Sequence, residues 1–151
     1  MQVWIDGLNG TRLSSCHRGP TCRPPASLEL TANASLQVER SEDGAEAEIG
    51  FFAVDPDLQG SGIGKRLLLR AERHAAATMG SRVAVLWVIS SRADLLGWYA
   101  RMGYATTDRT APFPVEANVG VPRPGTAIAF VRLEKAISPE SASGWDALTR
   151  A

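Results

Sequence analysis

Three glycines at alternate positions stand at the start of a long helical pattern in the first half of the chain. Residues 59–64 read QGSGIG, and they follow an apolar stretch that stops at Asp55-Pro56. Backbone N–H groups that no Cβ atom shields, at the positive end of a helix, are suited to bind phosphate oxygens. The spacing therefore indicates a phosphate-binding loop, with Lys65 and Arg66 adding positive charge. The structural alternative is a glycine-rich turn that only lets a helix pack close to a strand.

Two nucleotide-binding motifs do not match this segment. A Walker A loop needs glycine where Gln59 stands, and serine or threonine where Arg66 stands. The dinucleotide fingerprint G-x-G-x-x-G needs its third glycine where Lys65 stands. The phosphate ligand is therefore not predicted to be a nucleotide bound in either of these ways.

The elements that must position the loop follow from apolar periodicity and from turn residues. Leu28, Leu30, Leu36 and Val38 alternate with polar residues, as in a half-buried strand. The pattern then predicts a hairpin of 36–40 and 46–54, followed by a helix from Ile63 to Gly80 and a strand over 82–89. A second helix is capped by Asp94 and ended by Gly103. After it come a strand at 104–107, a loop over 111–125 and a last strand at 126–133. This order indicates a mixed α/β domain.

Residues 54–64 resemble the acyl-CoA-binding motif of the GNAT superfamily of N-acetyltransferases, V-x-P-x-x-[QR]-x-x-G-x-[GA]. Residues 86–88 (LWV) and 98–104 (WYARMGY) resemble the second block of that family, a strand and then a helix that ends in Y-x-x-x-G-[FY]. The similarity covers roughly residues 34 to 135. It implies the acyl-CoA N-acyltransferase fold, an α/β (α+β) architecture with a mixed, mostly antiparallel sheet, a splayed parallel strand pair and flanking helices. The splayed pair would be 46–54 and 83–89.

The resemblance implies transfer of an acetyl group from acetyl-CoA to a primary amine of a small molecule or a protein. The alternative is a catalytically impaired acyl-CoA-binding or interaction module that keeps only the cofactor half of the fold. Family members normally place a strand, two helices and a strand before the hairpin, whereas only 35 residues precede it here. The acceptor side is therefore expected to be truncated or replaced, which leaves a homodimer open.

By the same resemblance, backbone groups on the strand end, loop amides and one arginine would bind acetyl-CoA. These residues are Ala53, Val54, Gln59, Gly60, Ser61, Gly62, Ile63, Gly64, Lys65 and Arg92. Tyr99 matches the tyrosine that often protonates the departing thiolate, and core packing is its structural alternative. Glu48 is the candidate general base, and a solubilising surface role is its alternative. Core packing is expected for at least one of Phe51 and Phe52.

Composition places the chain among ordinary globular domains. Its 151 residues carry 16 Lys+Arg and 16 Asp+Glu, for a formal net charge of zero, and 44% are hydrophobic. This argues against nucleic acid and membrane as partners. Cys16 and Cys22 form no disulfide framework and match no zinc pattern. We expect a cytoplasmic protein without a metal.

The patterning predicts three segments. Residues 1–27 are a poorly patterned leader, for which a transit peptide, a loop and a mis-assigned start are the alternatives. Residues 28–137 form the GNAT-like domain, and residues 138–151 are a polar tail.

Overall fold

The computed structural model of the chain describes residues 2–6, 14–16, 34–113 and 128–139. The strand expected around Leu28 and Leu30, most of the loop expected over 111–125 and the end of the polar tail lie outside these ranges. The chain divides into two units, which are described separately below. The first comprises Met1–Ala84 with Ala136–Ala151, and the second comprises Val85–Lys135.

The predicted hairpin is confirmed in the first unit. Strand β3 (Ala34–Arg40) pairs antiparallel with β4 (Glu46–Val54), and β3 begins two residues earlier than predicted. The turn is stabilised by the Asp43 carboxylate, which accepts hydrogen bonds from the Ser41 hydroxyl (2.6 Å) and the Ala45 N–H (3.0 Å). These bonds lower the pKa of Asp43.

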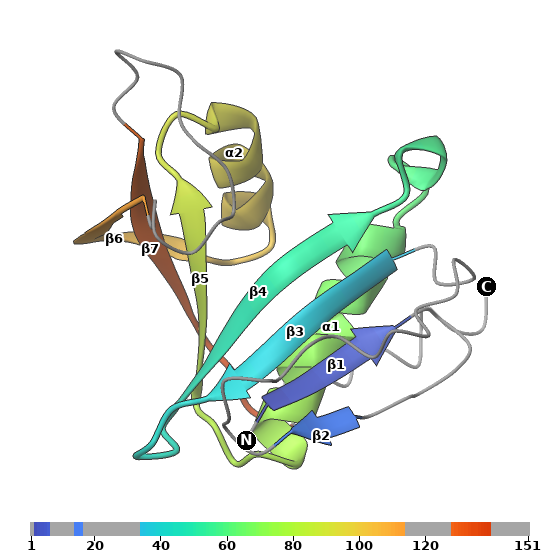
Figure 1. Cartoon of the computed structure of the whole chain (residues 1–151), viewed down its shortest axis with the longest axis vertical. Helices are drawn as coiled ribbons and strands as arrows, with labels where there is room; N and C mark the ends of the chain where they lie inside the picture. Colours follow the sequence, from blue (N-terminus) through green and yellow to red (C-terminus); the bar gives the residue numbers. More distant parts are fainter. Residues whose placement is uncertain (1, 7–13, 17–33, 114–127, 140–151) are drawn as a thin grey trace. The chain divides into compact units, whose positions relative to one another are not determined.

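Two further strands extend this sheet, in the order β2-β1-β3-β4 (Figure 1). Strand β1 (Gln2–Asp6) pairs antiparallel with β3 and with β2 (Ser14–Cys16). Both strands fall in residues 1–27, the segment that we described as a poorly patterned leader, and neither strand was predicted. Strands of five and three residues show too few alternations to be recognised, and it is the pairing of β1 with β3 that identifies it as a strand.

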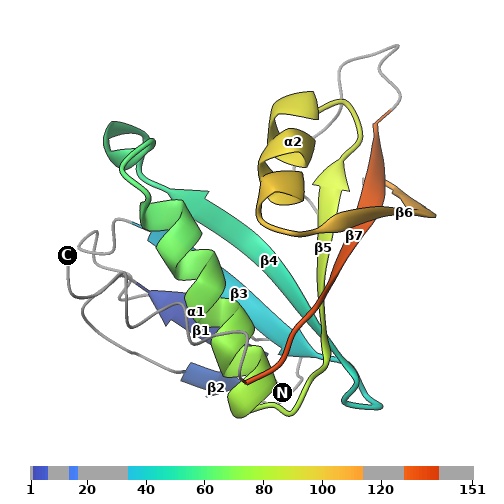
Figure 2. The same cartoon turned by 180° about the vertical axis from the view of Figure 1, so that it is seen from behind.

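Helix α1 (Ile63–Ala77) lies along one face of the sheet, in front of β3 and β4 in Figure 2. The predicted ridge is confirmed, since Leu67, Leu68, Ala71, Ala75 and Ala76 are buried on it. On the sheet, Leu36, Val38, Ala47 and Ile49 are also buried. Because side chains alternate along a strand, Glu46 and Glu48 belong to the opposite face. Burying the apolar ridge provides the main stabilisation of the helix.

The second unit contains a sheet of order β5-β7-β6 and helix α2. Strand β5 (Val83–Ile89) begins with two residues that belong to the first unit, where the Arg82 and Val83 N–H groups donate to the Ala45 carbonyl. Strands β6 (Ala105–Pro112) and β7 (Ala129–Ala136) pair antiparallel. Strand β6 ends five residues beyond its predicted end, whereas β7 begins at Ala129 and ends three residues beyond its predicted end. The mixed, mostly antiparallel α/β fold class is confirmed.

Helix α2 (Ala93–Arg101) is present, but its predicted cap is wrong. The N-cap residue is Arg92, and Asp94 lies inside the first turn. The Asp94 carboxylate instead accepts two hydrogen bonds from the Arg92 guanidinium, at 2.9 Å and 2.7 Å. The predicted end is confirmed, because Gly103 has a positive φ of 91° just after the helix, as a helix-ending residue often has.

Within the described residues, no helix is long and apolar enough to cross a membrane. Across these same ranges, no three His, Cys, Asp or Glu side chains come together in a way that would hold a metal ion.

Candidate active site

The segment after β4 is a compact turn that connects β4 to α1. Asp55 caps a 3-10 turn, η1 (Pro56–Leu58), by accepting a hydrogen bond from the Asp57 N–H at 3.0 Å. The Gln59 side-chain amide donates to the Val54 carbonyl at 3.3 Å, and this bond ties the loop back to the strand end. The two bonds therefore hold the start and the end of the turn in place, close to the end of β4.

Gly60 and Gly62 both have a left-handed backbone, with φ of 81° and 83°. Residues with side chains rarely adopt this conformation. A Cβ atom built on either glycine would meet nothing within 4 Å, so the space over the loop is open. The two glycines thus set the course of the backbone and leave room for a ligand to approach it.

The first turn of α1 contains backbone amides that have no acceptor within the helix. Gly62 is the N-cap residue and provides no side-chain cap, and the first bond of the helical type runs from the Arg66 N–H to the Gly62 carbonyl at 3.1 Å. The N–H groups of residues 62–65 precede that bond and have no acceptor within the helix. With the helix dipole, they are suited to hold an anion.

Two of the predicted loop amides are already used inside the loop. The Gln59 N–H donates to the Pro56 carbonyl and the Ser61 N–H to the Leu58 carbonyl, both at 3.3 Å. The Ser61 hydroxyl also donates to the Leu58 carbonyl. These contacts support a bracing role for Gln59 and Ser61, and they make the amides of residues 62–65 the better anion donors.

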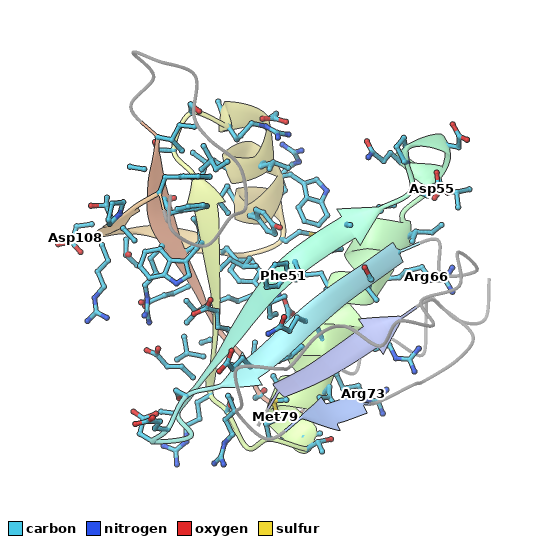
Figure 3. All side chains as sticks on the ribbon, viewed as in Figure 1. Phe51, Asp55, Arg66, Arg73, Met79 and Asp108 are labelled. Atoms are coloured by element: carbon cyan, nitrogen blue, oxygen red, sulfur yellow. The ribbon has the colours of Figure 1, made fainter. Side chains whose placement is uncertain are left out.

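Two basic side chains follow the loop at the start of α1. Lys65 is exposed. Arg66, labelled in Figure 3, is partly buried, and its Nε atom has no hydrogen-bond partner among the described residues. Both add positive charge to the first turn of the helix.

Strand β4 carries the remaining predicted residues of the first unit. Ala53 and Val54 pair with Ser35 and Ala34 of β3. Glu48 is exposed and lies directly opposite Glu39 in the register.

Between these positions, β4 contains a β-bulge. Gln37 pairs with Gly50 and Ser35 with Ala53, so Phe51 and Phe52 together lie opposite Leu36. Phe51 has a φ of 49° and is 68% exposed, and Phe52 is half-buried. Phe51 therefore does not pack in the core. No sequence signal indicated this, because the apolar run 49–54 looks like an ordinary buried strand.

Tyr99 lies in the second unit, on the buried side of α2. Only 6% of the residue is exposed, and its ring makes edge-to-face contacts with Trp98 (centroids 4.9 Å apart) and Tyr104 (5.8 Å). Burial raises the pKa of Tyr99 to about 12. The phenol therefore keeps its proton throughout the neutral and mildly alkaline range, as a proton donor must.

The raised pKa predicts an alkaline stability effect. In the unfolded chain the phenol ionises near pH 10, and in the folded chain it ionises only near pH 12. Folding stability from this group is thus fully present below pH 10 and is lost between pH 10 and 12. From pH 8 to pH 11 the wild type should lose about 1.4 kcal/mol more than Tyr99→Phe, measured by urea unfolding. Equal losses in the two proteins would contradict this assignment.

Arg92, also in the second unit, makes a two-point ion pair with Asp94. The shorter N–O distance is 2.7 Å, and both side chains are mostly exposed, at 51% and 64%. The contact lowers the pKa of Asp94 to about 2 and raises that of Arg92. Arg92, which we predicted to bind the cofactor, therefore already pairs its guanidinium with the Asp94 carboxylate.

This ion pair predicts a small contribution of Arg92 to acetyl-CoA binding. Arg92→Ala should weaken the affinity about two- to fivefold, the range typical of one exposed charge contact. Asp94→Asn serves as the control, because it frees the guanidinium and should not weaken binding. Calorimetric titration of acetyl-CoA into both variants measures this. An unchanged affinity in Arg92→Ala would show that Arg92 does not bind acetyl-CoA and has only a structural role at the start of α2.

The predicted residues therefore fall into two groups. Glu48, Ala53, Val54 and residues 59–65 lie together on β4, its following loop and the start of α1, in the first unit. Arg92 and Tyr99 lie on α2, in the second unit. The bracing bond of Gln59 and the capping of η1 by Asp55 were not predicted, although Asp-Pro is a recognisable start of a turn.

A strand, a glycine turn with exposed amides and a helix, within a mixed and mostly antiparallel α/β fold, define the acyl-CoA N-acyltransferase class. Comparison with family models matches residues 28–104 to the acetyltransferase (GNAT) family. The chain belongs to this family, whose cofactor is acetyl-CoA.

Solved structures share the fold. An IAA acetyltransferase from Bacillus cereus is 22% identical with a TM-score of 0.59, and the match covers 71% of each chain. A Bacillus subtilis acetyltransferase in complex with CoA is 21% identical with a TM-score of 0.57, over 70% of each chain. The ribosomal-protein-S18-alanine N-acetyltransferase from Escherichia coli is 22% identical with a TM-score of 0.56, over 71% of this chain and 63% of that one. A search of the curated proteins found no match.

Proposed function

We propose that the protein transfers the acetyl group of acetyl-CoA to a primary amine of a small molecule or a protein. Family membership supports an acetyltransferase that uses acetyl-CoA. The amine acceptor is our inference. It is in line with the alanine N-acetyltransferase among the similar structures, which is related to this chain at the level of fold. A cytoplasmic location and a homodimer remain predictions.

The observation that carries the proposal is the geometry of residues 60–65. Two left-handed glycines leave open space above the backbone, and the amides at the start of α1 have no acceptor in the helix. Such a site fits the pyrophosphate of coenzyme A, because it binds charge through the backbone and needs no cluster of basic side chains. The zero net charge of the chain is compatible with a site of this kind.

The chain's own residues would then act as follows. The amides of residues 62–65 hold the pyrophosphate, and backbone groups of Ala53 and Val54 bind the pantetheine arm. Glu48 accepts a proton from the incoming amine, and Tyr99 donates its proton to the departing thiolate. When bound, acetyl-CoA would supply the acetyl group as a thioester, and its C–S bond would break as the acetyl carbon forms a bond to the amine nitrogen. Because the pKa of Tyr99 is raised, its phenol is protonated at the start of each turnover.

Two measurements test the proposal. Acetyl-CoA should raise the melting temperature of the protein, as a ligand of the folded state must. Release of free thiol should then accelerate in the presence of some members of a panel of primary amines. Absence of a thermal shift at saturating acetyl-CoA would contradict the proposed site. A shift without thiol release on any amine would favour the binding-module alternative.

A further inference from the structure

Phe51 combines two unfavourable features. Among the residues that the structure describes, it is the non-glycine residue with a positive φ, 49°, and it is also the large apolar side chain left exposed, at 68%. A bulky residue in the left-handed region is a backbone outlier, with a strain of about 1–3 kcal/mol. Because most of the ring remains exposed, burial of the side chain offsets little of that strain.

The surrounding pairs hold this conformation in place. Gly50 pairs with Gln37 on one side of the bulge, and Ala53 pairs with Ser35 on the other. The strand is thus fixed before and after the bulge, and the extra residue has to be accommodated at positions 51 and 52. Strain of this kind, set between two fixed pairs, is typical of positions where a side chain is aimed at a ligand.

The position along β4 indicates which ligand. Figure 3 labels Phe51 on β4, short of the strand end that leads to Asp55. At roughly 3.3 Å per residue, Phe51 lies about 10 Å from Val54 along the strand, on the side away from the glycine loop. This step rests on the proposed function. If the pyrophosphate lies at residues 62–65 and the arm at Ala53 and Val54, the thioester end is the part that approaches the bulge.

We propose that the Phe51 side chain binds the apolar part of the acceptor and so selects primary amines that carry an aromatic or aliphatic body. The acetyl methyl group is too small to cover the ring, since a phenylalanine side chain has roughly 150 Å² or more to bury. An acceptor with an apolar body next to its amine covers this surface and gains the corresponding hydrophobic free energy.

The test compares two probes that share an ammonium group and differ by a phenyl ring, 2-phenylethylamine and ethylamine. The wild type should prefer 2-phenylethylamine in kcat/KM. Phe51→Asn should lower that preference by about tenfold or more, because asparagine tolerates a positive φ and removes the ring. Phe51→Leu keeps apolar area and should retain part of the preference. The Kd of acetyl-CoA of Phe51→Asn should stay close to wild type, and its Tm should be equal or higher, because asparagine tolerates the positive φ that strains phenylalanine.

The same comparison is made at equilibrium, so that slow turnover does not decide the result. With CoA bound, 2-phenylethylamine should raise the Tm of the wild type more than ethylamine does, and this difference should disappear in Phe51→Asn. No difference between the amines in the wild type, or the same difference in Phe51→Asn, would overturn the assignment. A parallel loss of acetyl-CoA affinity would also overturn it, in favour of a contact with the arm. If acetyl-CoA does not bind the wild type at all, the proposed function fails instead.

Discussion

Alanine in place of Gly62 should weaken acetyl-CoA binding by about tenfold or more while the chain remains folded. At a φ of 83° an L side chain is strained by roughly 1–2 kcal/mol, although its Cβ would meet nothing within 4 Å. The backbone can relieve this strain only by turning toward negative φ. That rotation would move the amides at the start of α1, where we place the pyrophosphate.

Gly80 offers a matched control at the other end of the same helix. Its φ is 71°, and a Cβ atom there would also meet nothing within 4 Å. Gly80→Ala should therefore lower the free energy of unfolding by about as much as Gly62→Ala, roughly 1–2 kcal/mol, and leave the Kd of acetyl-CoA unchanged. Urea unfolding and calorimetric titration of both variants measure the two quantities. If Gly62→Ala binds acetyl-CoA as tightly as Gly80→Ala does, the loop is only a structural turn.

Tyr99→Phe should lower kcat by about 100-fold or more, the usual effect of removing a general acid. The ring and its contacts with Trp98 and Tyr104 are kept, so only the hydroxyl is lost. The Kd of acetyl-CoA should change less than about twofold, since the loss falls on the chemical step and not on ground-state binding. Because the pKa of the phenol is raised to about 12, the wild-type rate should not fall through its ionisation below pH 10.

Tyr104→Phe is the control for a lost buried hydroxyl. Tyr104 is 4% exposed and its ring contacts that of Tyr99, so the packing change is of the same kind. Its kcat should remain within about threefold of wild type. Steady-state thiol release, together with acetyl-CoA titration, separates the two variants. Equal kcat values for Tyr99→Phe and Tyr104→Phe would assign Tyr99 to the core alone.

The elements recognised from sequence are those with strong local signals. Strand β4 was predicted with its observed bounds, because Asp55-Pro56 ends an apolar run, and α1 was predicted because its apolar ridge repeats at helical spacing. Strand β1 and the cap of α2 were missed. Strand β1 is defined by its pairing with β3. Asp94 does not cap α2, and its carboxylate pairs with the Arg92 guanidinium instead. Apolar periodicity along the chain indicates neither contact.

Residue types and their spacing alone were enough to predict the family, the glycine loop at the start of α1 and the candidate proton donor, Tyr99. These depend on residue types at short spacing, where backbone geometry follows from local chemistry. The folded structure was needed to show which loop amides are bonded within the loop, how deeply Tyr99 is buried and that Phe51 has a left-handed backbone with an exposed ring. The burial of Tyr99 and the bulge at Phe51 depend on residues brought together by packing or by strand pairing, which apolar periodicity does not indicate. The amide bonds of the loop are local, but they depend on the backbone conformation of the turn, which residue types at this spacing do not specify.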